Sequence, residues 1–365
     1  MGKWASSLEG MVETMSFWNG KKVLITGHTG FKGSWLSLWL QKLGADVTGF
    51  SLLPPTKTNM FDICKVQDNM HSVIGDVRDI QSLGKLFTEK QPEIVFHLAA
   101  QPLVRKSYEN PVETFDTNIM GLVNLLEVAR HYDSVKAVII ITSDKCYDNK
   151  EWLWGYRETD PVGGHDPYSC SKGCVELIVD SFRRSFYKSR SIALATVRAG
   201  NVIGGGDWAE DRLVPDLVST IIKNECPILR NPGAVRPWQL VIEPLYGYMQ
   251  LAEKIWDNIN GYSEAWNIGP GDTNIITVME LTQKFISFWG VNLKPVHDET
   301  SQPHEAQLLK LDCSKARTRL GWTTILNSDD TVKWTVDWYK GFVESGDMRD
   351  ITLKQISTYE EMRIV

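Results

Sequence analysis

The chain has 365 residues, of which 42% are hydrophobic and 23% charged, and its formal net charge is −6. This length and composition predict a globular protein with one large domain or two smaller ones and a sizeable buried core. No basic run indicates nucleic-acid binding and no polybasic helix indicates a membrane surface, so we expect neither partner. Because the overall field is slightly unfavourable for anions, an anionic ligand would need arginines or helix N-termini close to it.

Six cysteines are present and none forms a C-x-x-C pair, so we expect reduced thiols and no metal site. The first 20 residues contain no long apolar stretch. We therefore expect neither a signal peptide nor a transmembrane helix, and a cytoplasmic protein. Residues 1–17 are interpreted as a loose N-terminal extension.

The first half of the chain alternates between apolar strand-like runs and helical patterns. The runs are continuous, as expected for strands that are covered on both faces, and they lie at 22–26, 47–50, 73–75, 94–98, 137–142 and 192–197. Between the runs at 94–98 and 137–142, apolar residues recur at helical spacing over 112–131. This alternation predicts an α/β fold with a Rossmann-type, doubly wound parallel sheet.

After residue 200 the pattern changes to an irregular, glycine-rich loop followed by helices and short strands. We expect helices at 213–223, 243–259, 278–289 and 329–343, and strands at 228–230 and 265–268. Residues 18–200 are interpreted as the doubly wound domain. Residues 201–365 are interpreted as a smaller mixed α/β lobe at the carboxyl edge of the sheet, with some chain crossing back to the sheet.

A glycine motif, Gly27-x-x-Gly30-x-x-Gly33, follows the first strand, and we expect a helix to begin at Ser34. The glycines allow positive φ and a close approach of the backbone, and the helix N-terminus offers free N–H groups to a pyrophosphate. In this strand–turn–helix context the motif predicts a dinucleotide cofactor bound to the first domain.

Dinucleotide-binding folds usually place an acidic residue at the end of the second strand, where it binds the adenosine ribose. Here that strand ends at Ser51 without a carboxylate. Ser51 could still bond a ribose hydroxyl, whereas Lys57 could reach a 2′-phosphate, so NAD is our choice and NADP stays open. Asp76, which ends the third strand, is placed to meet the adenine side.

Tyr168 and Lys172 are four residues apart, so on a helix they share one face. Asp166 as N-cap and Pro167 in the first turn indicate that a helix does begin there. An adjacent ammonium favours the phenolate and predicts a tyrosine pKa lowered towards the range of a general base. Ser143, at the end of a preceding strand, would donate to the reacting oxygen, and Lys172 would hold the nicotinamide ribose.

Further motifs extend over nearly the whole chain: HLAAQ at 97–101, TSDKCY at 142–147, WGYRE at 154–158, GGHDPY at 163–168, RAGNV at 198–202 and GGDW at 205–208. Together with the glycine motif they resemble the extended short-chain dehydrogenases/reductases, and among these the nucleotide-sugar 4,6-dehydratases that act on CDP-D-glucose. The resemblance implies NAD as cofactor, with contacts at Gly27, Thr29, Gly30, Phe31, Gly33, Ser51, Asp76, Val77, Ala99, Ala100, Gln101, Asn118, Tyr168 and Lys172.

The resemblance also implies a reaction. Tyr168 takes the proton of the sugar 4-hydroxyl while C4 gives its hydride to NAD⁺. Water is then lost across C5 and C6, and the hydride returns to C6 to give a CDP-4-keto-6-deoxyglucose, a step of deoxysugar supply for lipopolysaccharide O-antigen. Asp144 would protonate the leaving hydroxyl. Lys145 stands where related dehydratases carry Glu, so it must be deprotonated by its surroundings, stabilise the enolate, or only orient Asp144.

Substrate contacts implied by the resemblance are Asn201, Arg212, Arg236 and, near the nucleotide, His304. The guanidinium fork suits a pyrophosphate because it binds two oxygens at once. Three alternatives stay open: a nucleotide-sugar 4-epimerase, a 4,6-dehydratase for another nucleotide-linked hexose, and a redox-sensing dinucleotide-binding protein without catalysis. An epimerase has no need of an acid after Ser143, and a sensor has no need of Tyr168 and Lys172.

Two helices, 112–131 and 168–187, show more apolar residues than are needed to cover a sheet. They are Ile119, Leu122, Val123 and Leu126 on the first, and Val175, Ile178, Val179 and Phe182 on the second. A bare patch of this kind is unusual on a monomer. We therefore expect a homodimer built through a four-helix bundle, and possibly a dimer of such dimers.

Overall fold

The computed structural model describes residues 17–271, 274–298 and 308–364. Its centre is a seven-stranded parallel sheet with the strand order β11-β6-β5-β4-β1-β2-β3. The strands are β1 (Lys22–Thr26), β2 (Asp46–Ser51), β3 (His71–Ile74), β4 (Ile94–His97), β5 (Ala137–Ile141), β6 (Ala193–Ala199) and β11 (Ala265–Ile268). The order reverses between β1 and β4, as in dinucleotide-binding folds. The doubly wound parallel sheet expected from the sequence is confirmed.

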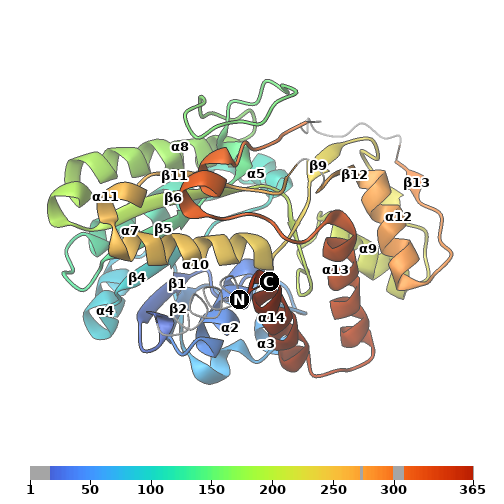
Figure 1. Ribbon diagram of the computed structural model, residues 1–365, viewed down its shortest axis with the longest axis horizontal. Coiled ribbons are helices and arrows are strands. Elements are labelled where there is room, and N and C mark those ends of the chain that lie inside the picture. Colours follow the sequence, from blue (N-terminus) through green and yellow to red (C-terminus); the bar gives the residue numbers. More distant parts are fainter. Residues whose placement is uncertain (1–16, 272–273, 299–307, 365) are drawn as a thin grey trace, which may run out of the picture.

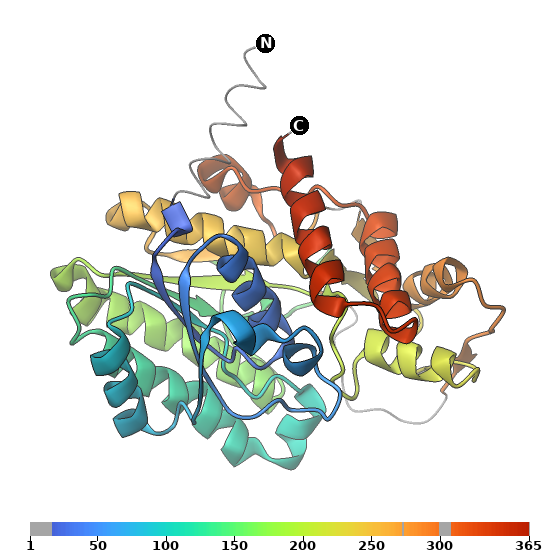
Figure 2. The same cartoon turned by 90° about the horizontal axis from the view of Figure 1, so that it is seen from below.

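Helices cover both faces of the sheet, and successive strand residues point to opposite faces. Leu24 of β1 joins the core under α4 (Ile80–Lys90), α7 (Gly121–Ala129) and α8 (Pro167–Phe182). Its neighbours Val23 and Ile25 join the core on the other face, under α2 (Phe31–Lys42), α10 (Ile242–Asp257) and α14 (Met348–Ile364). The two helical layers lie on opposite sides of the strands (Figures 1 and 2). This double covering explains the continuous apolar runs in the sequence.

Helix α2 is apolar on all sides, with Trp35, Leu36, Leu38 and Trp39 all buried. A helix of this kind needs a partner on the side away from the sheet, and α14 supplies it, lying beside α2 in Figure 2. The Trp39 indole donates to Glu360 of α14 at 2.7 Å. Helix α14 is therefore held against α2.

The smaller lobe lies to one side of the sheet (Figure 1). It contains the helices α9 (Leu213–Ile222), α12 (Val278–Trp289) and α13 (Ser328–Val343). The short strands β9 (Val235–Pro237) and β12 (Ile275–Thr277) pair antiparallel, and β8 (Ile228–Leu229) pairs with β13 (Val296–His297).

Two elements expected in the smaller lobe belong to the sheet layer instead. The strand at 265–268 is β11, which pairs parallel with β6 as the edge of the central sheet, and the helix expected at 243–259 is α10 on one face of it. Trp266 of β11 and Leu245 of α10 are both fully buried. The chain therefore crosses back to the sheet to cover an edge and a face that would otherwise be exposed.

The helix bounds differ from expectation at two places. Helix α2 begins at Phe31 rather than Ser34, with Gly30 in extended conformation as its N-cap. The helix expected over 112–131 is divided into α6 (Pro111–Phe115), a π-helical turn (Asp116–Met120) and α7. Helical periodicity in sequence does not distinguish a π turn from an α turn of similar composition.

The expected dimer patch needs a correction. Four of its eight residues lie in the core between the helices and the sheet, where they are 3% exposed or less: Leu122, Leu126, Val175 and Val179. Large apolar side chains that are exposed on the same two expected helices are Val112, Met120, Leu177 and Phe186. The apolar stripe that faces the sheet is thus wider than the sequence pattern indicated. The large apolar side chains that are exposed are not the ones expected to form the patch.

We predict that the last helix is anchored by a buried ion pair. Arg363 donates to Glu243 of α10 at 2.9 Å, and Glu243 is 1% exposed. Arg363→Met leaves a buried carboxylate without its cation, so the free energy of unfolding in urea should fall by about 3 kcal/mol. The control Lys354→Met removes an exposed pair with Asp350 on the same helix and should leave the free energy of unfolding nearly unchanged, because solvent screens such a pair. Equal effects of the two changes would contradict the anchor.

Candidate active site

A cavity of about 850 Å³ lies at the carboxyl edge of the sheet, beyond the ends of β1 and β4 and between them and the smaller lobe. Ligands of open α/β sheets bind at this position. Nearly all of the site residues predicted from the sequence line it: Gly27, Thr29, Gly30, Phe31, Gly33, Ser51, Asp76, Val77, Ala99, Ala100, Gln101, Ser143, Asp144, Lys145, Tyr168, Lys172, Asn201, Arg212 and Arg236.

The glycine loop brings two strand ends into contact. Gly27 has a φ of +79°, and a Cβ there would lie 2.7 Å from the backbone nitrogen of Ala99, which follows β4. At Gly33 a Cβ would lie 2.1 Å from the Gly27 carbonyl oxygen. Both positions therefore require glycine for close packing. Gly30 differs, because a Cβ there would meet only the Gly27 oxygen at 3.4 Å and would project into the cavity.

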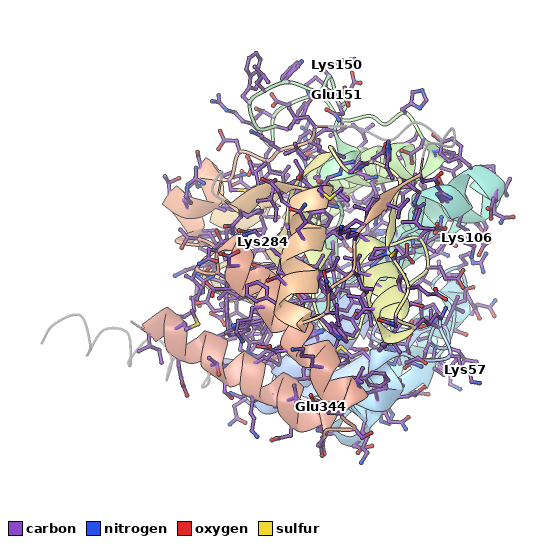
Figure 3. The ribbon with its side chains drawn as sticks, turned by 90° about the vertical axis from the view of Figure 1, so that its right-hand side faces the viewer. Lys57, Lys106, Lys150, Glu151, Lys284 and Glu344 are labelled. Atoms are coloured by element: carbon purple, nitrogen blue, oxygen red, sulfur yellow. The ribbon has the colours of Figure 1, made fainter. Side chains whose placement is uncertain are left out.

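The adenosine end of the cavity carries a hydroxyl where many relatives of this fold carry a carboxylate. The Ser51 hydroxyl lies 2.9 Å from that of Thr29, which donates to the Leu52 carbonyl at 2.9 Å. Asp76 accepts from the Arg78 guanidinium at 2.6 Å, and this hydrogen bond lowers the pKa of Asp76. Lys57 does not line the cavity and lies at the outer surface (Figure 3).

Asn118 lies behind the cavity and does not line it. Its side chain accepts from the backbone N–H of Gln101 at 2.7 Å and donates to the Gln101 carbonyl at 3.1 Å. It also donates to the Ser171 hydroxyl of α8 at 2.9 Å. Asn118 therefore fixes the loop after β4 to the helix that carries Tyr168. His304, the remaining predicted contact, lies outside the described residues.

Asp144 and Ser143 form the acidic part of the site. The Ser143 hydroxyl donates to the Asp144 carboxyl at 2.9 Å, and Asp144 is 4% exposed. Burial raises the pKa of Asp144, against the opposing effects of Lys145, Ser143 and Arg236. The carboxyl group thus tends to hold its proton, as a general acid must. Lys145 follows directly and lines the same cavity.

Tyr168 and Lys172 lie one turn apart on α8, and the Lys172 ammonium is 5.9 Å from the centre of the phenol ring. The expectation of a lowered tyrosine pKa is wrong for this structure. Burial raises the pKa of Tyr168 to about 12, although Ser143 and Arg212 act to lower it. Burial likewise lowers the pKa of Lys172 to about 8. Desolvation is the largest effect on the pKa of both groups.

A buried network that the motifs did not reveal fixes α8 in place. Glu176, one turn beyond Lys172, accepts from the Thr142 hydroxyl at 2.6 Å, the Thr196 hydroxyl at 2.7 Å and the Arg198 guanidinium at 2.8 Å. Burial acts to raise the pKa of Glu176, but Arg198 and these hydrogen bonds lower it overall. Thr142 directly precedes Ser143, so the network sets the catalytic helix against the strand end that carries Ser143 and Asp144.

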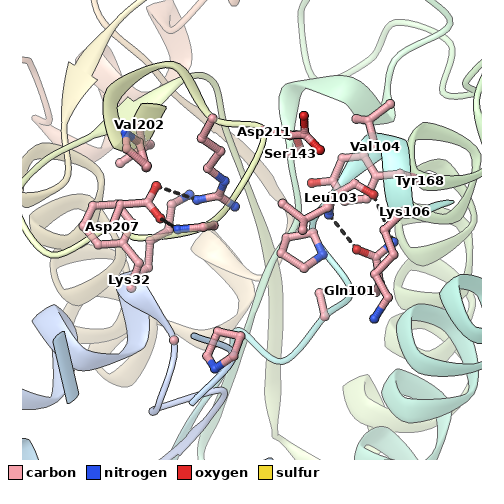
Figure 4. A pocket seen from close by; sticks show the side chains of 18 of the residues that line it. Lys32, Gln101, Leu103, Val104, Lys106, Ser143, Tyr168, Val202, Asp207 and Asp211 are labelled. Carbon is pink, nitrogen blue, oxygen red and sulfur yellow. Dashed lines mark hydrogen bonds and ion pairs between the residues drawn. The ribbon is translucent and has the colours of Figure 1, made fainter. Parts of the chain in front are cut away.

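Lys32 also lines the cavity, although sequence reasoning passed over it. The available signal was a charged residue inside the glycine motif, next to the helix start. Figure 4 shows Lys32 with Asp207 on one side of the cavity and Ser143 and Tyr168 on the other. Arg212 donates to Asp207 at 2.8 Å, so one of the two predicted substrate arginines is held by a carboxylate.

One buried histidine near the site, His97, has a structural role. His97, at the end of β4, forms a hydrogen bond with the Thr26 hydroxyl at 2.7 Å, and burial lowers its pKa to about 3. In the described part of the chain no cluster of His, Cys, Asp and Glu could hold a metal ion. Among the same residues, no helix combines the length and apolarity needed to span a bilayer. The six cysteines, all described, form no disulfide.

A sequence model of the family described as GDP-mannose 4,6 dehydratase matches residues 24–335. The chain belongs to this family. It is 50% identical over 349 residues to the CDP-glucose 4,6-dehydratase of Salmonella typhimurium, a match that covers 94% of this chain and 97% of that protein. The resemblance to nucleotide-sugar dehydratases is thereby confirmed.

Solved structures share the fold at lower identity. The UDP-glucose 4-epimerase of Thermotoga maritima with UDP-glucose has a TM-score of 0.78 and 24% identity, over 88% of this chain and 99% of that one. The dTDP-glucose 4,6-dehydratase of Bacillus anthracis in complex with NAD has a TM-score of 0.73 and 21% identity, over 90% and 99%. These similarities confirm the Rossmann-type fold.

We predict that the Glu176 network supports both stability and alignment. Glu176→Gln keeps the side-chain shape but removes the charge that balances buried Arg198, so the free energy of unfolding should fall by about 3 kcal/mol. Turnover should also fall at temperatures where the variant is folded, because α8 loses its fixed position. Glu89→Gln, at an exposed pair with Lys85, is the control and should cost about 0.5 kcal/mol or less. An unchanged turnover in folded Glu176→Gln would exclude the alignment role.

Proposed function

We propose that this protein is an NAD-dependent 4,6-dehydratase that converts CDP-D-glucose to CDP-4-keto-6-deoxy-D-glucose. The observation that carries the proposal is the buried Asp144 carboxyl, held by Ser143 in the same cavity as Tyr168 and Lys172. Oxidation needs the tyrosine and the lysine, and elimination needs an additional acid. The 50% identity to a CDP-glucose 4,6-dehydratase supports the choice of substrate.

The glycine loop fits a dinucleotide cofactor. Gly30 leaves open space at the start of α2, no side chain caps that helix, and its first turn carries no acidic residue. Its unpaired N–H groups and partial positive charge suit a pyrophosphate. NAD is favoured over NADP because Lys57 lies away from the cavity, while Ser51 and Asp76 line it. When bound, the cofactor accepts a hydride from C4 of the sugar and later returns it to C6.

Tyr168 takes the proton of the 4-hydroxyl in the oxidation step. Burial keeps this residue as a phenol, so forming the phenolate requires help. Ser143 and Arg212 both act to lower its pKa and supply part of that help. Lys172, on the same helix face, holds the nicotinamide ribose and adds positive charge. The new C4 ketone then acidifies the proton at C5.

Elimination uses the next residues along the chain. Burial raises the pKa of Asp144 and so favours its protonated form, and this form gives its proton to the departing 6-hydroxyl, which leaves as water. The proton at C5 must leave at the same stage. Lys145 lines the cavity beside Asp144, and it either accepts that proton in its uncharged form or stabilises the enolate as an ammonium.

The nucleotide part is bound from the smaller lobe. Arg236 on β9 and Arg212, directly before α9, line the cavity together with Asn201. Arg236 acts to lower the pKa of Asp144, so its charge lies close to the acid. Arg236 is the better candidate for the diphosphate, because it lies on a strand of the smaller lobe and lines the cavity.

The decisive experiment is an assay with varied nucleotides. The protein is incubated with NAD⁺ and CDP-, dTDP-, UDP- or GDP-linked hexoses, and alkali is added to reveal the ultraviolet absorbance of a 4-keto-6-deoxy sugar. We expect this absorbance with CDP-D-glucose and little with the other nucleotides. Formation of a 4-epimer without the absorbance would establish an epimerase instead. Cofactor binding without turnover of any sugar would favour the redox-sensing alternative.

Two variants separate oxidation from elimination. Tyr168→Phe removes the proton acceptor and should lower turnover by about 10²–10⁴-fold, with no reduced cofactor on the enzyme. Asp144→Asn keeps the oxidation but lacks the acid, so NADH should accumulate on mixing with CDP-D-glucose. Absorbance at the NADH wavelength in stopped flow measures both. A Tyr168→Phe variant with near-normal turnover, or an Asp144→Asn variant without accumulated NADH, would contradict these roles.

The second copy of this chain is the expected macromolecular partner. Met120, Leu177 and Phe186 are exposed on the α7–α8 side of the molecule, with Leu177 at 62%. Phe186 is covered partly by the Arg130 guanidinium, 4.8 Å from its ring centre, so the two helices share one outer surface. Pairing this surface with its two-fold copy would form a four-helix bundle next to the helix that carries Tyr168.

We predict that Leu177→Glu disrupts this dimer. A charge at the centre of an apolar interface is strongly unfavourable, so the variant should sediment as a monomer at micromolar concentration, whereas the wild type sediments as a dimer or a dimer of dimers. The control Leu153→Glu changes an exposed apolar residue that lies on a loop outside these helices, and it should leave the assembly intact. A wild-type monomer with full activity would rule the arrangement out.

A further inference from the structure

One part of the cavity, inside the smaller lobe, takes no part in the chemical steps proposed above. Helix α9 contributes Leu213, Asp216 and Leu217 to its lining, and β8 contributes Ile228 and Leu229. The three residues of α9 are spaced by three or four positions, so they share one face of the helix. Largely apolar walls that carry a few polar groups suit a flat ligand such as a nucleobase.

Asp216 is a cavity carboxylate with most of its hydrogen-bonding capacity unused. Among the described residues its side chain has one partner, Arg230 at 3.5 Å, the outer limit of a hydrogen bond. Two other described carboxylates of the smaller lobe line the cavity and are bound more closely. Asp207 pairs with Arg212 at 2.8 Å, and Asp211 pairs with Arg230 at 3.1 Å. An ionised carboxyl group offers about four acceptor positions, so Asp216 has positions left for a ligand.

The Asp216 carboxyl group is partly withdrawn from water although it keeps its charge. Its side chain is 49% exposed, and burial raises its pKa to about 6 against the opposing effect of Arg230. The group is therefore mostly ionised at neutral pH. A ligand that donates a hydrogen bond to this carboxylate compensates for the lost water, whereas a ligand that presents an acceptor is repelled.

The pyrimidine bases differ at the edge that such a pair would contact. Cytosine carries an amino donor at C4 beside the acceptor N3, whereas uracil and thymine carry an oxygen acceptor at C4 beside an N3–H donor. The carboxylate of Asp216 and the guanidinium of Arg230 form an acceptor beside a donor. This arrangement matches cytosine at both positions and opposes uracil and thymine at both.

On the basis of the proposed function, we infer that Asp216 and Arg230 together select cytosine as the base of the substrate. The Asp216 carboxylate accepts a hydrogen bond from the exocyclic amino group, and the Arg230 guanidinium donates one to N3. Asp216 and Arg230 are specificity-determining residues, because they contact the base and not the sugar atoms that react.

The test measures the preference for cytidine over uridine directly. Dissociation constants for CDP and UDP are measured by isothermal titration calorimetry for the wild type, Asp216→Asn and Arg230→Met. The wild type should bind CDP more tightly. The ratio of the UDP constant to the CDP constant should fall by about 10- to 100-fold in Asp216→Asn, the discrimination of one good base contact, because the amide can donate to the uracil oxygen. Arg230→Met, which removes the donor to N3, should also lower this ratio.

Asp211→Asn is the matched control, because it removes the same charge from beside the same arginine. It should keep the wild-type ratio. The inference is wrong if Asp216→Asn changes both constants equally or leaves them unchanged, if Asp211→Asn lowers the ratio as much, or if the wild type does not prefer CDP. A wild type that prefers CDP but does not dehydrate CDP-D-glucose would instead refute the proposed reaction and leave the selection of the base supported.

Discussion

Loss of water around charged groups at the carboxyl edge of the sheet is the constraint on which the site depends. Burial raises the pKa of Asp144, raises that of Tyr168 to about 12, and lowers those of Lys32 and Lys172 to about 8. All four shifts favour the uncharged form. An acid whose protonated form is favoured and lysines that lose their protons more readily than usual are suited to a reaction in which protons leave O4 and C5, one is delivered to O6, and one returns to C5 with the hydride at C6.

Two buried carboxyl groups, those of Glu176 and Asp144, show how the fold sets the pKa of an acidic side chain. Glu176 receives hydrogen bonds from two threonine hydroxyls and a guanidinium, and it remains ionised although it is buried. Asp144 receives a hydrogen bond from Ser143 alone among side chains, and its pKa rises. The number of donors therefore decides which carboxylate is structural and which is an acid. The structural one holds α8 and so positions Tyr168 and Lys172 relative to the other.

Sequence predicted the fold and the composition of the site because both follow from local patterns. The parallel strands end at one edge, so the motifs that follow them, such as Gly27–Gly33 and the residues around Ser143, meet there. What it did not predict depends on packing between distant segments. The pKa of Tyr168 follows from its burial and from charges that include Arg212, and the environment of Lys32 includes Asp207 and Arg212, far along the chain. Helix α14 lacks a clear apolar stripe, so its packing against α2 was not indicated either.

The same scaffold serves an epimerase with a TM-score of 0.78, so the backbone does not decide between the two reactions. Both need a tyrosine and a lysine beside a dinucleotide; only elimination needs a proton for a departing hydroxyl. That proton requires space as well as a raised pKa. At Gly200, which follows β6, a Cβ would lie 3.2 Å from an Asp144 carboxyl oxygen, closer than ordinary contact. A larger residue at 200 would press on the acid, so the glycine and the aspartate together make this cavity suited to loss of water.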